Sequence, residues 1–335
     1  MTNTTNLASA RLGAQAIACS DDFFADKTRL IQDAAPVFLL DRYDDHGKWM
    51  DGWESRRRRS MGHDWCVIKL AVPGRLQRFD VDTTHFTGNY PPGARVEGAD
   101  TDACPEPDSA AWRPLTPMLA LSGDHAHSAD CLDGDTVYRW IRLVIYPDGG
   151  VARLRAWGQP QIDVSANGRA ELSALIHGGR IVGYSDAHYG NVEAVLTAGR
   201  GVDMGDGWET ARRRVPGNEW LVIALGAPGV IDEIEIDTAH FKGNYPAGVS
   251  VQAAAMPADL SDQALITQAM FWPELLAYQA LSADHIHRFP VAAGDAVSHI
   301  RVNSHPDGGM SRIRAFGRFQ APASAPPTTD RRLNR

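Results

Sequence analysis

The sequence predicts an all-β protein that consists of two tandem copies of one antiparallel sandwich domain. Three observations support this fold class. Long blocks of the chain occur twice, apolar and polar residues alternate with a period of two, and Gly- and Pro-rich turns separate these runs. The length of 335 residues agrees, since one domain typically takes about 100–200 residues.

The repeat is strongest over residues 51–93, which return as residues 206–248 without a gap. Of these 43 positions, 23 carry the same residue in both copies. Later blocks continue the match: LSGDHAH returns as LSADHIH, and IRLVIYPDGGVARLRAWG as IRVNSHPDGGMSRIRAFG. A weaker pair, SDDFFA and SDAHYG, precedes them. We therefore place the first domain at 1–165 and the second at 166–319, and expect 320–335 to be a disordered tail.

Each copy indicates strands rather than helices. WCVIKL and WLVIAL predict buried strands that end at Pro-Gly. The alternation of Phe79 and Val81 with aspartates, and of Ile234 and Ile236 with acidic residues, predicts strands with one buried face. The Asp-Gly of YPDGG and HPDGG is typical of a hairpin turn. A helix is expected only around 265–281.

Composition excludes several partners. Lys and Arg number 33 against 41 Asp and Glu, so the net charge of −8 disfavours binding to nucleic acid or to an anionic membrane surface. No signal peptide and no run of about 18 apolar residues is found. The four cysteines, Cys19, Cys66, Cys104 and Cys131, form no CxxC pair. We expect a cytoplasmic protein with neither a nucleic-acid nor a membrane partner.

A run of arginines follows the DGWE block in each copy. Arginine presents a planar, permanently charged group that binds a carboxylate in a bidentate manner, so a small anionic substrate is one interpretation. Ion pairs with local carboxylates are the other. Alternation along a strand means that neighbouring arginines cannot all face one pocket. The predicted substrate-binding arginines are Arg57, Arg58, Arg212 and Arg213.

A second recurring block, DT-x-HF-x-GNYP, carries polar side chains on a loop at a strand end, where sites commonly lie. It could equally be a structural corner. Histidine titrates near neutral pH, and a nearby glutamate could serve as a base. The predicted catalytic residues are Glu54, His85, Glu209 and His240. The predicted substrate-binding residues of this block are Asn89, Tyr90, Asn244 and Tyr245.

The motif D-H-x-H occurs once in each copy. Its histidines would share one face of a strand and could hold zinc or manganese, although this spacing is common and hydrogen-bonded histidines explain it as well. The alternative metal ligands are His125, His127, His285 and His287. The sequence predicts no cofactor and leaves a divalent metal open.

At the DGWE-RRR and DT-x-HF-x-GNYP blocks the chain resembles the allantoicase family, from about Ser20 to Gly317. The resemblance implies two jelly-roll β-sandwiches related to galactose-binding-like domains. It also implies a hydrolase of linear amidines that converts allantoate and water to ureidoglycolate and urea in allantoin and purine degradation. One departure is visible, since Ala211 and Asn218 stand where the first copy has Arg56 and His63. The two copies therefore need not be equally competent.

Allantoate carries one carboxylate and two ureido groups on a single carbon. Arginine suits the carboxylate, asparagine suits the ureido groups, and an acid is needed for the departing urea nitrogen. A homo-oligomer is also expected. Two alternatives stay open: a hydrolase of another ureido compound such as ureidoglycolate, and a non-catalytic ligand-binding sandwich. The second usually accompanies a catalytic domain, and none is recognised in this sequence.

Overall fold

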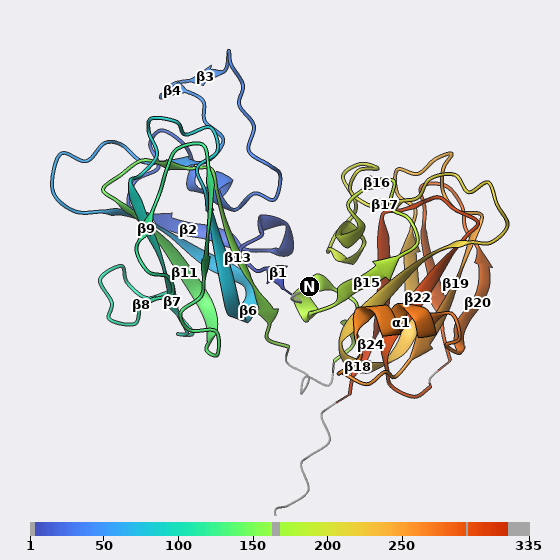
Figure 1. The fold of residues 1–335 in the computed structure, drawn as a ribbon. Helices are drawn as coiled ribbons and strands as arrows, with labels where there is room; N and C mark the ends of the chain where they lie inside the picture. The colour runs from blue at the N-terminus through green and yellow to red at the C-terminus, as the bar shows by residue number, and fades with distance from the viewer. Residues whose placement is uncertain (1–3, 163–167, 293, 321–335) are drawn as a thin grey trace, which may run out of the picture.

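The computed structural model describes residues 4–162, 168–292 and 294–320. Each copy forms a jelly-roll β-sandwich, and the two sandwiches lie side by side (Figure 1). The fold class is thus as predicted. The boundary expected at 165 and most of the expected tail lie outside the described residues.

The first copy runs from β1 to β13. Its strands are β1 (Thr5–Asn6), β2 (Gln15–Cys19), β3 (Tyr43–Asp44), β4 (Gly47–Lys48), β5 (Trp53–Glu54), β6 (Asp64–Asp82), β7 (Gly93–Ala99), β8 (Arg113–Pro114), β9 (Leu119–Ala120), β10 (Ala126–Asp130), β11 (Val137–Tyr146), β12 (Gly150–Val151) and β13 (Arg153–Pro160). Two short 3-10 helices, η1 (Ala10–Leu12) and η2 (Lys27–Ile31), complete it.

The second copy repeats this order with one α-helix added. Its strands are β14 (Ala170–Glu171), β15 (Arg180–Tyr184), β16 (Tyr189–Gly190), β17 (Trp208–Glu209), β18 (Glu219–Asp237), β19 (Gly248–Ala254), β20 (Glu274–Ala280), β21 (Ile286–Pro290), β22 (Val297–His305), β23 (Gly309–Met310) and β24 (Arg312–Phe319). Its helices are η3 (Leu175–His177), η4 (Val192–Leu196) and α1 (Asp262–Ala269).

One long strand organises each sandwich. The first half of β6 pairs with β2 and β11, and its second half pairs with β10 and β13. β18 does the same with β15 and β22, then with β21 and β24. Each long strand therefore takes part in both layers, and the inward side chains of both halves fill one core. Phe79, Val81, Ile234 and Ile236 are fully buried, as their alternation predicts.

The prediction that Pro-Gly ends these strands is wrong. β6 continues through Pro73, and β18 continues through Pro228. In both copies the ladder to the neighbouring strand shifts register near this dipeptide. Proline is tolerated where a ladder is interrupted, because no N–H is needed there. Pro-Gly thus marks the passage of one strand from one layer to the other.

The hairpin predicted at PDGG is also wrong. β11 and β13 do not pair with each other; both pair with β6, on different stretches of it. The intervening segment instead forms β12, which pairs with β5. A connection between layers needs a tight turn as much as a hairpin does, so glycine and aspartate alone do not distinguish the two.

The expected helix around 265–281 is only partly correct. α1 covers Asp262–Ala269, but residues 274–280 form β20, which pairs with β19. Pro273 stands between them, and proline disfavours helical geometry in the residue before it. The free edge of β19 then offers backbone partners to the segment that follows.

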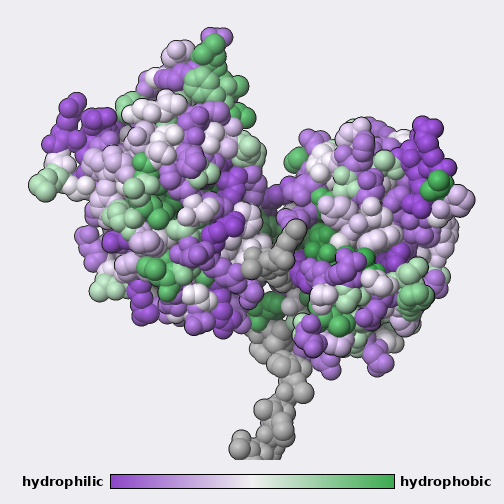
Figure 2. Space-filling model, viewed as in Figure 1, coloured by the Kyte–Doolittle hydropathy of each residue, from purple (hydrophilic) through white to green (hydrophobic). Residues whose placement is uncertain are grey.

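A projecting arm, residues 34–49, distinguishes the first copy. It contains β3 and β4, and several apolar side chains on it are exposed, among them Leu40 at 71% and Tyr43 at 68%. Figure 2 shows apolar residues at the tip of this projection. The structure therefore leaves an apolar surface at the end of the arm.

The two sandwiches meet through charged and polar contacts. The Arg11 guanidinium of the first copy forms an ion pair with Asp206 of the second and donates to Thr197 Oγ1 at 3.0 Å. Asp206 also pairs with the buried Arg312 at 3.0 Å. In the parts of the chain described, no helix has the length and apolar character needed to cross a membrane.

Candidate active site

Two equivalent grooves open at the loop ends of the sandwiches, one in each copy. Groove 1 has a volume of about 400 Å³, and groove 2 about 480 Å³, enough for a small metabolite. The polar side chains of groove 1 are Glu54, Ser55, Arg57, Asn89, Tyr90 and Asp148. Those of groove 2 are Glu209, Thr210, Arg212, Asn244, Tyr245, Asp307, His188 and Tyr189. Most of the residues predicted for the site thus come together, once in each copy.

A glutamate and an asparagine meet at the centre of each groove. Asn89 Nδ2 donates to Glu54 Oε1 at 2.7 Å, and Asn244 donates to Glu209 in the same way. Burial raises the pKa of the Glu54 carboxyl, and the bond from Asn89 opposes this shift. Each glutamate is half-buried, so it can face a ligand in the groove while the amide fixes its orientation.

The arginine runs divide between two tasks. Arg57 and Arg212 line the grooves with exposed side chains, and neither forms an ion pair within the described part of the chain. Arg58 instead bonds the Asp64 carboxylate at 2.8 Å, and Arg213 bonds Glu219 at 2.7 Å. One arginine of each run is therefore available to an anion, and the next holds the segment to its own sandwich.

The PDGG turn forms the floor of each groove. Gly149 has φ +139°, and a Cβ there would lie 2.7 Å from Asn89 O; Gly308 has φ +132° and the same closeness to Asn244 O. Asp148 and Asp307 accept the backbone N–H of Arg58 and Arg213 at 2.9 and 2.7 Å. This turn recurs in both copies. Because the sequence pattern is typical of a hairpin, its residues were not predicted to belong to the site.

The DGWE block orients its glutamate through its other residues. Trp53 is fully buried and donates from Nε1 to Asp21 O at 2.8 Å; Trp208 does so to Asp186 O at 2.7 Å. The aspartate of the block pairs with a buried arginine, Asp51 with Arg153 at 2.8 Å. Both ends of the block are thus anchored, and the glutamate points into the groove.

The predicted catalytic histidines lie outside both grooves. His85 and His240 have φ near +70°, and each backbone N–H bonds an aspartate carboxylate at 2.8 Å. Their Nε2 atoms lie 3.2 Å from Pro36 O and 2.7 Å from Gly201 O. The rings therefore tie the GNYP loop to neighbouring segments. A part for them in proton transfer stays a prediction.

The second histidine of each D-H-x-H motif, His127 and His287, bonds the backbone through its ring. His127 Nε2 accepts the Ser122 N–H at 3.0 Å, and His287 Nε2 accepts that of Ser282 at 2.9 Å. A nitrogen that accepts an amide hydrogen has no lone pair left for a metal. Burial lowers the pKa of His287, which agrees with a neutral ring. Within the described ranges, no three His, Cys, Asp or Glu side chains are arranged to hold a metal ion.

The wall of the groove is where the two copies differ. Phe24 lines groove 1, whereas His188 and Tyr189 line groove 2. The backbone N–H of Phe24 and that of His188 donate to the carbonyl oxygen of the groove glutamate, at 3.3 and 3.0 Å. Sequence reasoning missed these residues, because SDDFFA and SDAHYG match only weakly.

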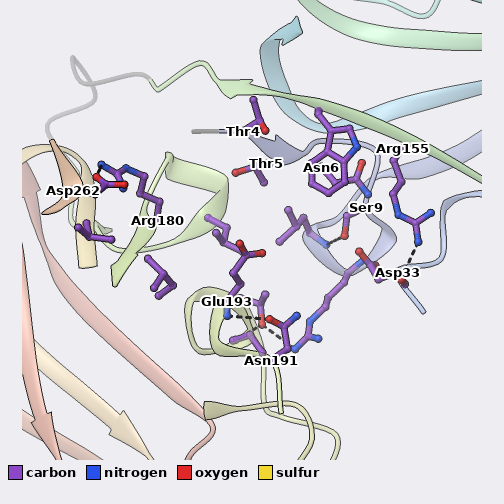
Figure 3. A pocket seen from close by; sticks show the side chains of 18 residues that line it. Thr4, Thr5, Asn6, Ser9, Asp33, Arg155, Arg180, Asn191, Glu193 and Asp262 are labelled. Atoms are coloured by element: carbon purple, nitrogen blue, oxygen red, sulfur yellow. Dashed lines mark hydrogen bonds and ion pairs between the residues drawn. The ribbon is translucent and has the colours of Figure 1, made fainter. Parts of the chain in front are cut away.

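A further cavity of about 400 Å³ lies between the copies (Figure 3). Its arginines already have partners. Arg180 pairs with Asp262 at 2.7 Å, Arg155 donates to Asp33 O at 3.4 Å, and Arg11 pairs with Asp206. An anion entering this cavity would have to displace these contacts, so the two loop-end grooves are the better candidate sites.

Known proteins resemble this chain in sequence and in fold. The profile of the allantoicase repeat family matches residues 5–161 and 170–320. The chain is 52% identical to a probable allantoicase of Acinetobacter baylyi, over 94% of each chain. It is 50% identical to probable allantoicase 2 of Burkholderia pseudomallei, over 93% of this chain and 94% of that one. The crystal structure of allantoicase from Saccharomyces cerevisiae superposes with a TM-score of 0.78 at 32% identity, covering 94% of this chain and 93% of that one.

Proposed function

The chain belongs to the allantoicase family, and we propose that its reaction, the hydrolysis of allantoate to ureidoglycolate and urea in purine degradation, takes place in the loop-end grooves. The observation that carries this assignment is the repeated set of one glutamate, one asparagine that donates to its carboxylate, and one arginine without an ion-pair partner among the described residues. The interdomain cavity also has Glu193, Asn191 and Arg155 in its lining, but Asn191 there bonds the backbone N–H of Glu193, not its carboxylate.

Each groove residue answers one chemical need of allantoate. The exposed guanidinium of Arg57 or Arg212 binds the substrate carboxylate. Tyr90 or Tyr245, with the free edge of the asparagine amide, holds the ureido groups. Arg58 and Arg213, which are already paired with carboxylates, support the segment from behind.

The glutamate acts as the base of the reaction. Glu54 or Glu209 takes a proton from the attacking water, whose oxygen bonds to the central carbon of allantoate. The bond from that carbon to one ureido nitrogen breaks, and this nitrogen must gain a proton to leave as urea. The net change is the addition of one water molecule.

Urea release by the purified protein tests the assignment. We expect wild-type protein to release urea from allantoate, and the double variant Glu54→Gln with Glu209→Gln to lose at least about 10³-fold in kcat while its Tm stays within 2 °C. Ureidoglycolate in a parallel assay measures the narrower alternative substrate. A double variant that keeps normal turnover would place the reaction elsewhere.

We also propose that the enzyme acts in the cytoplasm as a homo-oligomer. Cys19 and Cys66 stand opposite each other on β2 and β6 as free thiols, which suits a reducing compartment. The exposed apolar tip of the arm supports self-association. Light scattering on a size-exclusion column should give a mass above the 36.5 kDa of one chain, and Leu40→Asp should lower it.

A further inference from the structure

We propose that the two grooves are unequal: in groove 2 the His188 imidazole protonates the departing urea nitrogen, whereas groove 1, with Phe24 in the corresponding place, turns substrate over slowly. This inference rests on the proposed function, because it assumes that the grooves are the sites of hydrolysis. It deepens that function by naming the acid and the copy that supplies it.

Strand pairing with the groove glutamates supports the correspondence between Phe24 and His188; the N–H of Ala25 also donates to Glu54 O, at 3.3 Å. Both residues line their groove, and both donate their N–H to the carbonyl oxygen of the groove glutamate. Sequence alignment would pair His188 with Phe23, but the strand register shifts the match by one. Glu54 pairs with Ala25, and Glu209 pairs with Tyr189. A phenyl ring and an imidazole therefore occupy the same wall.

The residues around the two walls also differ. Beside groove 1, Arg56 bonds Asp21 at 2.6 Å and lies 5.1 Å over the Phe23 ring, which stacks on His46 of the arm at 4.2 Å. Phe23 in turn contacts Phe24 edge to face at 5.3 Å, so this stack supports the wall residue from behind. In groove 2, Ala211 replaces Arg56, and only its backbone N–H bonds the corresponding Asp186, at 2.6 Å.

In groove 2 the wall residues are exposed to solvent, whereas Phe24 of groove 1 packs against the Phe23 ring. His188 and Tyr189 are both exposed, and their rings meet edge to face at 4.3 Å. The charged and titratable groups that line groove 2 together with His188 and Tyr189 are Glu209, Arg212, Tyr245 and Asp307. Within the described ranges the His188 imidazole forms no hydrogen bond, and it lines the same groove as the proposed base and the proposed carboxylate ligand.

The chemistry requires such a group. Glu209 removes a proton from water, the water oxygen bonds to the central carbon, and the bond to the ureido nitrogen breaks. The electron pair of that bond goes to nitrogen, which takes a proton from the His188 imidazolium and leaves as urea. The proton held by Glu209 then returns to His188. Histidine suits this step because it exchanges protons near neutral pH. Among the described residues that line groove 1, none is a histidine.

The test is His188→Phe in the full chain, which gives groove 2 the wall of groove 1. We expect kcat to fall at least about 100-fold, because general-acid assistance is typically worth 10²- to 10⁴-fold. The decline of kcat at alkaline pH that reports the acid should disappear. In His188→Ala, added imidazole should restore at least tenfold of the lost rate. His285→Phe, which replaces an exposed histidine of the same copy outside both grooves, is the matched control and should stay within twofold.

The outcomes separate the two proposals. If His188→Phe keeps kcat within threefold while the double glutamine variant is inactive, the grooves are the sites but His188 is not the acid. If imidazole fails to rescue His188→Ala, a proton-transfer part for this residue is likewise overturned. If the double glutamine variant is itself active, the assignment of the grooves fails, and this inference fails with it.

Discussion

The two grooves have the same frame and different walls. Glu, Arg, Asn, Tyr and Asp occupy matching places in both, held by the same tryptophan, the same buried arginine and the same glycine turn. The wall changes from Phe24 to His188 and Tyr189, and two smaller lining residues change with it, Ser55 to Thr210 and Pro92 to Ala247. Both copies thus share the residues that fix the backbone and the central polar side chains of the groove, whereas the side chains of one wall differ.

The largest difference between the two grooves should come from alanine substitutions in the glycine turn that forms their floor. Gly308→Ala places a Cβ 2.6 Å from Pro246 N and 2.7 Å from Asn244 O, so the loop that carries Asn244 must move. We expect a loss of more than about 100-fold in kcat/KM. Gly149→Ala causes the same local damage in groove 1.

The two alanine variants should have similar Tm values because the strain is equivalent, but Gly149→Ala should keep most of the activity. Thermal scans and urea release on the same preparations measure both quantities. Equal losses of activity would contradict the inequality of the grooves.

Substitutions of the carboxylate-binding arginine should also affect groove 2 more than groove 1, but by a smaller factor. Arg212→Lys keeps the charge of groove 2 but removes the bidentate geometry that a carboxylate favours. We expect KM for allantoate to rise about 10-fold, with kcat little changed, and Arg57→Lys to change KM by less than threefold. A larger effect of Arg57→Lys on KM would indicate that most of the allantoate is hydrolysed in groove 1.

The contact between the copies gives a third, structural comparison. Arg11 covers Asp206 from the other sandwich, whereas the matching Asp51 accepts the Val37 N–H of its own arm at 3.0 Å. Removing one partner of a mostly buried pair is costly, so Arg11→Met should lower the free energy of unfolding by about 1–2 kcal/mol. Arg56→Met, which breaks a pair whose arginine side chain is 62% exposed, should cost under about 1 kcal/mol. Denaturant titrations of both variants measure the difference.

The smallest effect concerns pH. Burial raises the pKa of the Glu171 carboxyl to about 7, while the matching position of the first copy is the neutral Asn6. The folded protein holds this proton more tightly than the unfolded chain, whose glutamate titrates near about 4.3. The protonated Glu171 therefore contributes its full stabilisation below about pH 4.3. This contribution is lost as the pH rises toward 7.

Glu171→Gln should remove this dependence. Between pH 5 and pH 7.5, wild type should lose on the order of 1 kcal/mol more stability than the variant. Tm measured across this range for both proteins decides the point, and parallel curves would show that Glu171 does not titrate there.

The sequence predicts the site best where the two copies match most strongly. Glu54, Asn89 and Arg57 lie inside long matching blocks, so their recurrence pointed to a site before any geometry was known. Asp148 also recurs, but a turn between layers and a hairpin turn use the same residues. The fold class was accessible because alternation reports which face of a strand is buried.

The rest depends on pairing between distant segments. No local pattern tells that Arg58 bonds Asp64 while Arg57 faces the groove, or that His85 reaches Pro36 O. Phe24 and His188 correspond only through their backbone bonds to the groove glutamates, one position away from the sequence match. Such registers are properties of the folded chain.

The most direct test of this account compares the two glutamates singly. Urea release from allantoate is measured for Glu209→Gln and for Glu54→Gln at saturating substrate. We expect Glu209→Gln to lower kcat by at least about 100-fold and Glu54→Gln to lower it by less than threefold. Equal losses would contradict the inequality of the grooves, and normal turnover in both would contradict the assignment of hydrolysis to them.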